Sequence, residues 1–219
     1  MHPHDPANRH VDAKALPDPR IDARTRSGRF KMVLLLLFCA SPVIASYFTY
    51  YVIRPAGGQT NYGTLVQPQR PIPEALRIVD EQGESHPLAA FKGKWLLITV
   101  HGSACDTVCT EQLFLARQTR ISQGAERERV MPVWMITDDG PVDPRLTAAY
   151  NDEKGAVRFL RASRTALEEW LPVEAGGDVR DHLFLVDPIG NLMMRFPVKA
   201  DPAKVRSEMI KLLKYNRVG

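Results

Sequence analysis

The most informative part of this 219-residue chain is residues 91–113, FKGKWLLITVHGSACDTVCTEQL. Within it, Trp95 to Val100 is an unbroken run of apolar and β-branched side chains, which is the pattern of a strand buried inside a sheet. A helical stretch ending near Gly124 follows. Its apolar side chains recur at helical spacing, at Cys105, Cys109, Leu113 and Ala116. The sequence therefore predicts a buried strand leading into a helix whose first turn carries two cysteines.

The segments on either side of this unit complete an α/β pattern. Met131 to Ile136 gives the next strand, and a strand, helix and strand of these lengths imply a parallel pair with a right-handed crossover. Gly83 marks a short hairpin upstream, and a turn at residues 187–190 joins strands at 183–186 and 192–196. Further helices are expected to start at Pro144, Ser163 and Pro202. This order predicts an α/β fold, a thioredoxin-like domain.

An apolar segment lies ahead of this domain. The 22 residues from Met32 to Ile53 carry no charged side chain, and a helix of about 20 residues crosses the hydrocarbon core of a bilayer. Four aromatic rings near its end suit the membrane interface, namely Tyr47, Phe48, Tyr50 and Tyr51. A cleaved secretory signal is the alternative. Because the segment is longer than the core of a signal, we expect an uncleaved transmembrane helix.

Positive charge is distributed unequally around this segment. Residues 12–31 contain six Lys and Arg, whereas residues 54–73 contain two. Since positive side chains resist translocation, the N-terminus is expected to stay in the cytoplasm. The expected location is a bacterial inner membrane, crossed once, with the C-terminal domain in the periplasm, where thiols can be oxidised. The formal net charge of +4 lies largely beside the membrane, so no nucleic-acid partner is expected.

These patterns divide the chain into four parts. Residues 1–31 are a cytoplasmic tail, 32–53 the transmembrane helix, 54–73 a Pro/Gly-rich linker and 74–219 the thioredoxin-like domain. The tail holds three histidines, but its Pro- and Asp-rich composition favours a solvated segment over a metal site; they are His2, His4 and His10. Three cysteines in the whole chain exclude a disulfide-rich scaffold.

Cys105 and Cys109 are suited to two kinds of chemistry. Sulfurs four residues apart on one helical face can converge on one metal ion or close a disulfide. The positive end of the helix dipole favours the thiolate that either reaction needs. An ordinary buried pair is the third interpretation, but the carboxyl end of a parallel strand is where α/β sheets place their ligand sites.

The layout resembles the Sco/SenC family of membrane-anchored, thioredoxin-like copper proteins that take part in assembling the copper centre of cytochrome c oxidase. The resemblance covers roughly residues 74–219 and rests on residues 91–95, the CxxxC pair and Asp181-His182 before the last hairpin. It implies that Cys105, Cys109 and His182 bind copper. Thiolates suit Cu(I), and an imidazole extends the site to Cu(II).

Two departures identify the chain as a divergent member of that family. Thr110 follows the second cysteine where the family usually has proline, and residues 137–144 match the family's acidic loop only loosely. The carboxylates of Asp138 and Asp139 in this loop either tune the site or cap turns. His101, at the end of the predicted strand, is an extra ligand or a general base, with a non-ligand role preferred.

Three functions are compatible with these residues. The favoured one is a membrane-anchored copper metallochaperone that delivers copper to a cytochrome c oxidase subunit or another copper protein. The alternative is a periplasmic thiol-disulfide oxidoreductase that uses Cys105 and Cys109 as its catalytic redox dithiol. Dedicated thioredoxin-like oxidoreductases resemble one another in a CxxC spacing and a proline before the facing strand, and here CxxxC and Asp181-His182 stand instead. A membrane-tethered scaffold with a vestigial site is the third reading.

Overall fold

The computed structural model describes residues 19–53, 61–150, 152 and 156–216. The chain divides into two compact units, residues 1–58 and 59–219, and each is described by itself. The predictions made for the tail histidines fall outside the described residues.

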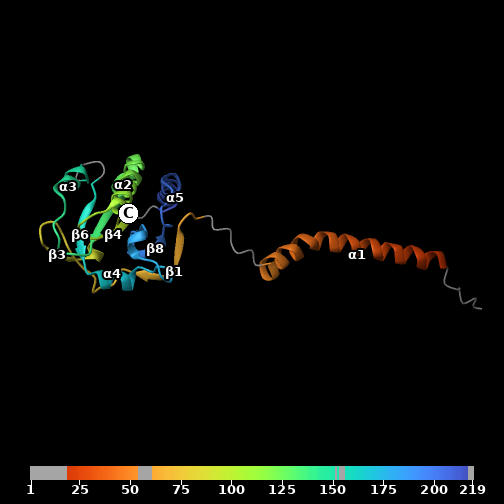
Figure 1. Cartoon of the computed structure of the whole chain (residues 1–219). Coiled ribbons are helices and arrows are strands. Elements are labelled where there is room, and N and C mark those ends of the chain that lie inside the picture. Colours follow the sequence, from red (N-terminus) through yellow and green to blue (C-terminus); the bar gives the residue numbers. More distant parts are fainter. Residues whose placement is uncertain (1–18, 54–60, 151, 153–155, 217–219) are drawn as a thin grey trace, which may run out of the picture. The chain divides into compact units, whose positions relative to one another are not determined.

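The first unit contains one long helix. Helix α1, Pro19–Phe48, continues into the π-helical segment η1, Thr49–Ile53 (Figure 1). Its stretch Ser27–Tyr51 has a mean hydropathy of 2.0 and is long and apolar enough to cross a membrane. The helix begins ahead of the apolar segment because several residues before Met32 are good helix formers, such as Arg and Ala. Near its end, Tyr51 stacks on Tyr47 with ring centroids 5.7 Å apart.

The second unit is built on one sheet of eight strands in the order β1-β8-β7-β4-β5-β6-β2-β3. The strands are β1 Thr64–Pro71, β2 Arg77–Val79, β3 Ser85–Pro87, β4 Trp95–His101, β5 Val130–Ile136, β6 Arg158–Ala162, β7 Phe184–Val186 and β8 Asn191–Arg195. The neighbours β4, β5 and β6 run parallel, and the other pairs are antiparallel. The parallel β4–β5 pair confirms the predicted crossover.

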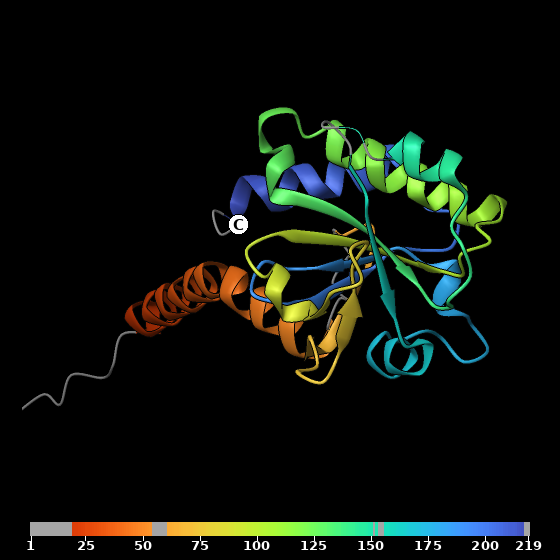
Figure 2. The same cartoon turned by 90° about the vertical axis from the view of Figure 1, so that its left-hand side faces the viewer.

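Helices cover both faces of this sheet. They are α2 Thr107–Ile121, α3 Pro144–Tyr150, α4 Arg164–Trp170 and α5 Pro202–Tyr215, with short 3-10 segments η2 Leu88–Phe91, η3 Gly124–Arg129 and η4 Val179–Asp181. Figure 2 shows α2, α3 and α5 on one face and α4 on the other. Successive side chains of β4 alternate between the faces, so Trp95 and Leu97 pack with α2 and α5 while Leu96 and Ile98 pack with α4.

Two of these strands are not predicted by the sequence. Strand β1 lies inside the predicted linker of residues 54–73 and pairs with β8, so the prediction that the folded domain begins at residue 74 is wrong. Pro68 and Pro71 are tolerated there because an edge strand needs fewer backbone donors than a central one. Strand β6, with Phe159 and Leu160 buried between arginines, is too short for its pattern to be recognised.

Candidate functional site

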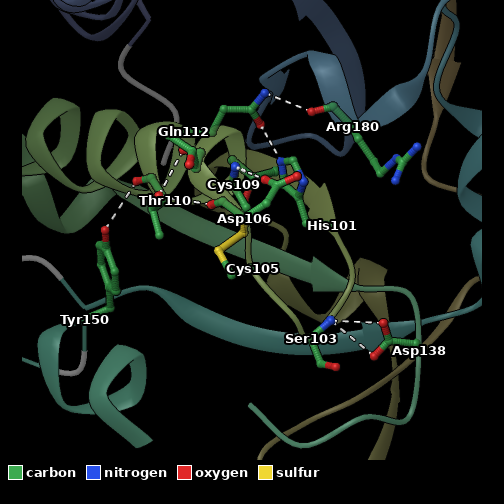
Figure 3. Close-up of a disulfide and its surroundings, with 12 residues drawn as sticks. His101, Ser103, Cys105, Asp106, Cys109, Thr110, Gln112, Asp138, Tyr150 and Arg180 are labelled. Atoms are coloured by element: carbon green, nitrogen blue, oxygen red, sulfur yellow. Dashed lines mark hydrogen bonds between the residues drawn. A yellow bond between two sulfur atoms is a disulfide. The ribbon is translucent and has the colours of Figure 1, made fainter. Parts of the chain in front are cut away.

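The two cysteines lie where β4 gives way to α2. Strand β4 ends at His101, and α2 begins at Thr107 with Asp106 as its N-cap (Figure 3). The Asp106 carboxylate accepts the backbone N–H of Cys109 at 2.9 Å, as is typical of an N-cap aspartate. The prediction that both cysteines sit in the first helical turn is therefore wrong for Cys105, which precedes the cap.

Cys105 and Cys109 are joined by a disulfide, with their Cα atoms 5.2 Å apart. The two sulfur-bearing residues differ in exposure, because Cys105 is partly exposed whereas Cys109 is fully buried. Cys109 packs in a cluster with Leu113 and Trp134. The bond thus has one side that a partner molecule can approach and one side that the core covers.

Thr110, the residue that departs from the family pattern, forms hydrogen bonds in the first turn of α2. Its backbone N–H donates to the Asp106 carbonyl at 3.0 Å, a hydrogen bond that proline could not make. Its hydroxyl donates to the carbonyls of Asp106 and Thr107. From α3, the Tyr150 hydroxyl donates to the Thr110 carbonyl at 3.4 Å, and burial raises the pKa of that phenol.

Asp138 contacts the loop that leads to Cys105. Its carboxylate accepts the backbone N–H of Ser103, and hydrogen bonding from the Ser103 side chain is the main cause that lowers its pKa. The sequence could not decide between an electrostatic and a turn-capping role for this loop, and in the structure Asp138 accepts backbone hydrogen bonds. The neighbouring Asp139 is exposed.

A chain of hydrogen bonds links β4, α2 and η4. His101 is buried, and its Nε2 donates to Gln112 Oε1 at 3.1 Å, while Gln112 Nε2 donates to the Arg180 carbonyl at 2.9 Å (Figure 3). Burial is the largest cause that lowers the pKa of His101, which favours the neutral form of the ring. Sequence reasoning missed Gln112, although its place three residues after Cys109 puts it beside that cysteine on α2.

His182 lies between η4 and β7. Because β7 runs antiparallel to β4 with Phe184 opposite Ile98, His182 lies at the sheet end where β4 terminates. Its ring is buried, and Nδ1 donates to the Phe196 carbonyl at 2.9 Å. The ring also meets Phe184 edge-on at a centroid distance of 6.1 Å.

The three residues predicted to bind copper are thus arranged as a bonded pair and a separately fixed imidazole. Within residues 19–53, 61–150, 152 and 156–216, no three His, Cys, Asp or Glu side chains are grouped so that they could hold a metal ion. The covalent contact among these three residues is the Cys105–Cys109 disulfide.

Comparison with solved structures finds similar chains at low identity. Sco1 of Thermus thermophilus is 20% identical, with a TM-score of 0.49 over 72% of this chain and 99% of that one. Yeast Sco1 with copper bound is 14% identical, with a TM-score of 0.47 over 73% and 96%. The thioredoxin domain of a thiol-disulfide oxidoreductase from Bacteroides vulgatus is 18% identical, with a TM-score of 0.45 over 65% and 94%.

The match to a protein family is more specific. Among curated proteins, none matches this sequence. A family model described as the transmembrane-like, thioredoxin-like, C-terminal domain matches residues 95–216, more than half of the chain, and that range contains Cys105, Cys109 and His182. This match confirms the predicted fold class and is consistent with a divergent Sco/SenC member. The chain therefore belongs, through its C-terminal domain, to the transmembrane-like, thioredoxin-like family.

Proposed function

We propose that this protein carries out thiol–disulfide exchange through Cys105 and Cys109. The observation that carries the proposal is the disulfide itself, with Cys105 partly exposed and Cys109 fully buried. Exchange needs one sulfur that a partner can reach and a second that resolves the mixed disulfide from within the same molecule. The N-terminal end of α2 stabilises a thiolate at this position.

The reaction balances between this chain and its partner. In the reduced form, the Cys105 thiolate attacks a partner disulfide, which forms a mixed disulfide and releases one partner thiolate. The Cys109 thiolate then attacks the Cys105 sulfur, closing the bond seen in the structure and releasing the second partner thiolate. Two electrons pass from this dithiol to the partner. The same steps in reverse oxidise a partner dithiol.

The first unit supplies a membrane anchor in this proposal. Helix α1 is long and apolar enough to cross a bilayer, and Lys and Arg are concentrated on its N-terminal side. On the basis of the positive-inside rule, we propose that the N-terminus stays in the cytoplasm of a bacterium and that residues 59–219 lie in the periplasm, beyond the inner membrane. An oxidising compartment is one in which a disulfide such as Cys105–Cys109 persists.

Copper delivery is the second candidate function, with the metal as cargo. One observation favours it: Nδ1 of His182 donates to a backbone carbonyl, which leaves the lone pair on Nε2. Metal-binding histidines are commonly held by such a bond. In this proposal Cys105 and Cys109, once reduced, bind Cu(I) together with His182, and the recipient is a cytochrome c oxidase subunit or another copper protein.

The first experiment tests exchange in the full-length chain in detergent micelles. Cys39 is changed to serine, so that only Cys105 and Cys109 remain as thiols. The protein is equilibrated with mixtures of reduced and oxidised glutathione, and its dithiol fraction is measured by alkylation and mass spectrometry. We expect one two-electron transition, together with catalysis of insulin disulfide reduction that Cys105→Ser abolishes. Full insulin activity in Cys105→Ser would refute the proposal.

The second experiment measures copper in the same background. The reduced chain is titrated with Cu(I) under anaerobic conditions, and His182→Asn is the informative variant because its side-chain amide still donates to the Phe196 carbonyl but lacks Nε2. If copper delivery is correct, one Cu(I) binds and His182→Asn weakens its binding at least about tenfold. Equal Cu(I) affinity in both proteins would remove His182 from the site and leave exchange as the function.

A further inference from the structure

The loop before Cys105 is fastened to the loop that follows β5. Asp138 Oδ1 and Oδ2 lie 3.1 and 3.0 Å from the backbone nitrogen of Ser103, and Oδ1 also accepts the Gly140 N–H at 3.1 Å (Figure 3). Ser103 is buried, so its N–H would lose its partner if this carboxylate were removed. One side chain therefore joins two loops that are far apart in the sequence.

Arg161 of β6 fixes the Asp138 loop from a second direction. One of its guanidinium nitrogens donates to the Asp138 carbonyl, and the other donates to the Gly140 carbonyl at 2.8 Å. The loop that presents the carboxylate to Ser103 is thus itself attached to the rigid parallel part of the sheet.

The two loops also pack too closely for larger residues. A Cβ atom at Gly102 would lie 2.5 Å from Asp138 Oδ2, and one at Gly140 would collide with the Ser103 hydroxyl. A larger residue at Gly102 would displace the Asp138 carboxylate, and one at Gly140 would displace the Ser103 hydroxyl. Glycine at both positions therefore allows this close approach of the two loops.

We propose that Asp138 is a positioning residue for the dithiol. By holding Ser103, it keeps Cys105 close to Cys109 and so raises the equilibrium constant for closing the disulfide. Cys105 precedes the first turn of α2, so the loop at residues 102–104 determines where its sulfur lies. A fixed loop raises the effective concentration of one sulfur at the other, in the way that orientation favours any intramolecular reaction. This inference rests on the proposed exchange function.

The test measures the redox equilibrium of the full-length chain in the Cys39→Ser background. One protein dithiol and one glutathione disulfide give one protein disulfide and two reduced glutathiones, and the equilibrium constant follows from the dithiol fraction. Asp138→Ala should lower this constant about three- to tenfold, which corresponds to the net free energy of one or two hydrogen bonds. Asp138→Asn keeps an acceptor for the Ser103 N–H and should lower it less. Asp139→Ala, an exposed carboxylate one residue away, should leave it unchanged.

The outcomes separate positioning from other roles. An unchanged constant in Asp138→Ala, with both redox forms losing equal thermal stability, would mean that Asp138 is merely structural and would overturn the inference. Equal losses in Asp138→Ala and Asp138→Asn would point to removal of the negative charge and would also overturn it. If the parent chain forms no disulfide at any glutathione ratio, the proposed function fails before Asp138 is tested.

Discussion

The cysteine loop and the His182 segment lie at the same end of the sheet but are held in different ways. The loop at residues 102–106 is fixed by side chains from its surroundings, with Asp138 bonding Ser103 and Asp106 capping α2. The His182 ring donates to the backbone carbonyl of Phe196, the residue directly after β8, and packs edge-on against Phe184. The cysteine loop and the His182 ring are therefore held by different sets of direct contacts. Gln112 connects the two regions through His101 and the Arg180 carbonyl.

The largest expected effect concerns the difference in exposure between Cys105 and Cys109. In the Cys39→Ser background, Cys109→Ser leaves the partly exposed Cys105 as a free thiol, while Cys105→Ser leaves the buried Cys109. Because alkylation requires an accessible thiolate, the first variant should react with iodoacetamide at least about 100-fold faster. Mass spectrometry over a time course measures both rates. Equal rates would mean that the two sulfurs do not have the distinct roles assigned to them.

Substitution of His182 is expected to lower the stability of the folded chain. His182→Ala leaves the Phe196 carbonyl without its donor and opens space beside Phe184, so it should lower the free energy of unfolding by about 1–3 kcal/mol. Chemical denaturation of the oxidised chain measures the loss. His182→Asn is the matched control, since it keeps a donor at the Nδ1 position and should recover part of the stability. If both variants are as stable as the parent, the Phe196 hydrogen bond does not fix this segment.

A smaller effect is expected at the link between the two regions. Gln112→Ala removes one hydrogen bond to His101 and one to the Arg180 carbonyl, so unfolding should become easier by about 1 kcal/mol. Gln118→Ala on the same helix is the matched control for loss of a glutamine side chain. Equal stabilities of these two variants would show that the cysteine loop and the His182 segment are energetically independent.

The smallest expected effect is the contribution of His101 to the pH dependence of folding stability. Burial lowers its pKa in the folded state from the ordinary value of 6.5, in the same direction as Arg180, and outweighs the Gln112 hydrogen bond and the charges of Asp106 and Asp178, which raise it. Below about pH 6.5 the unfolded chain therefore binds more protons than the folded one, and stability falls as the pH decreases towards the folded pKa. His101→Gln should flatten this slope in denaturation curves between pH 5 and 7.5. An unchanged slope would assign it to other groups.

Segments with a clear apolar pattern or a turn motif predicted much of the fold. The run at residues 95–100 became β4, and Asp187-Pro188-Ile189-Gly190 became the turn between β7 and β8. The sequence failed where tertiary pairing decides the structure. Strand β1 is rich in proline and acquires its conformation from β8, and β6 is a five-residue strand stabilised by its neighbours β5 and β2.

Of the candidate site, the sequence could predict the reactive side chains but not the residues that hold them in place. Cysteines at 105 and 109 after a buried strand predicted a pair able to bind a metal ion or to close a disulfide, and the structure contains the disulfide. Around the pair, Asp138 bonds Ser103 and Gln112 bonds the Arg180 carbonyl, and these partners lie 35 and 68 residues away in the chain. Such long-range contacts leave no local pattern in the sequence.

The pairing of β1 with β8 also bears on solubility. Strand β1 lies at one edge of the sheet, and an exposed edge is a template on which another chain can add a strand and begin to aggregate. Pro68 and Pro71 have no N–H to offer, and the register shift between Leu65 and Arg70 interrupts the regular ladder. The prolines that made this segment look like a spacer thus reduce the number of backbone donors with which another chain could pair.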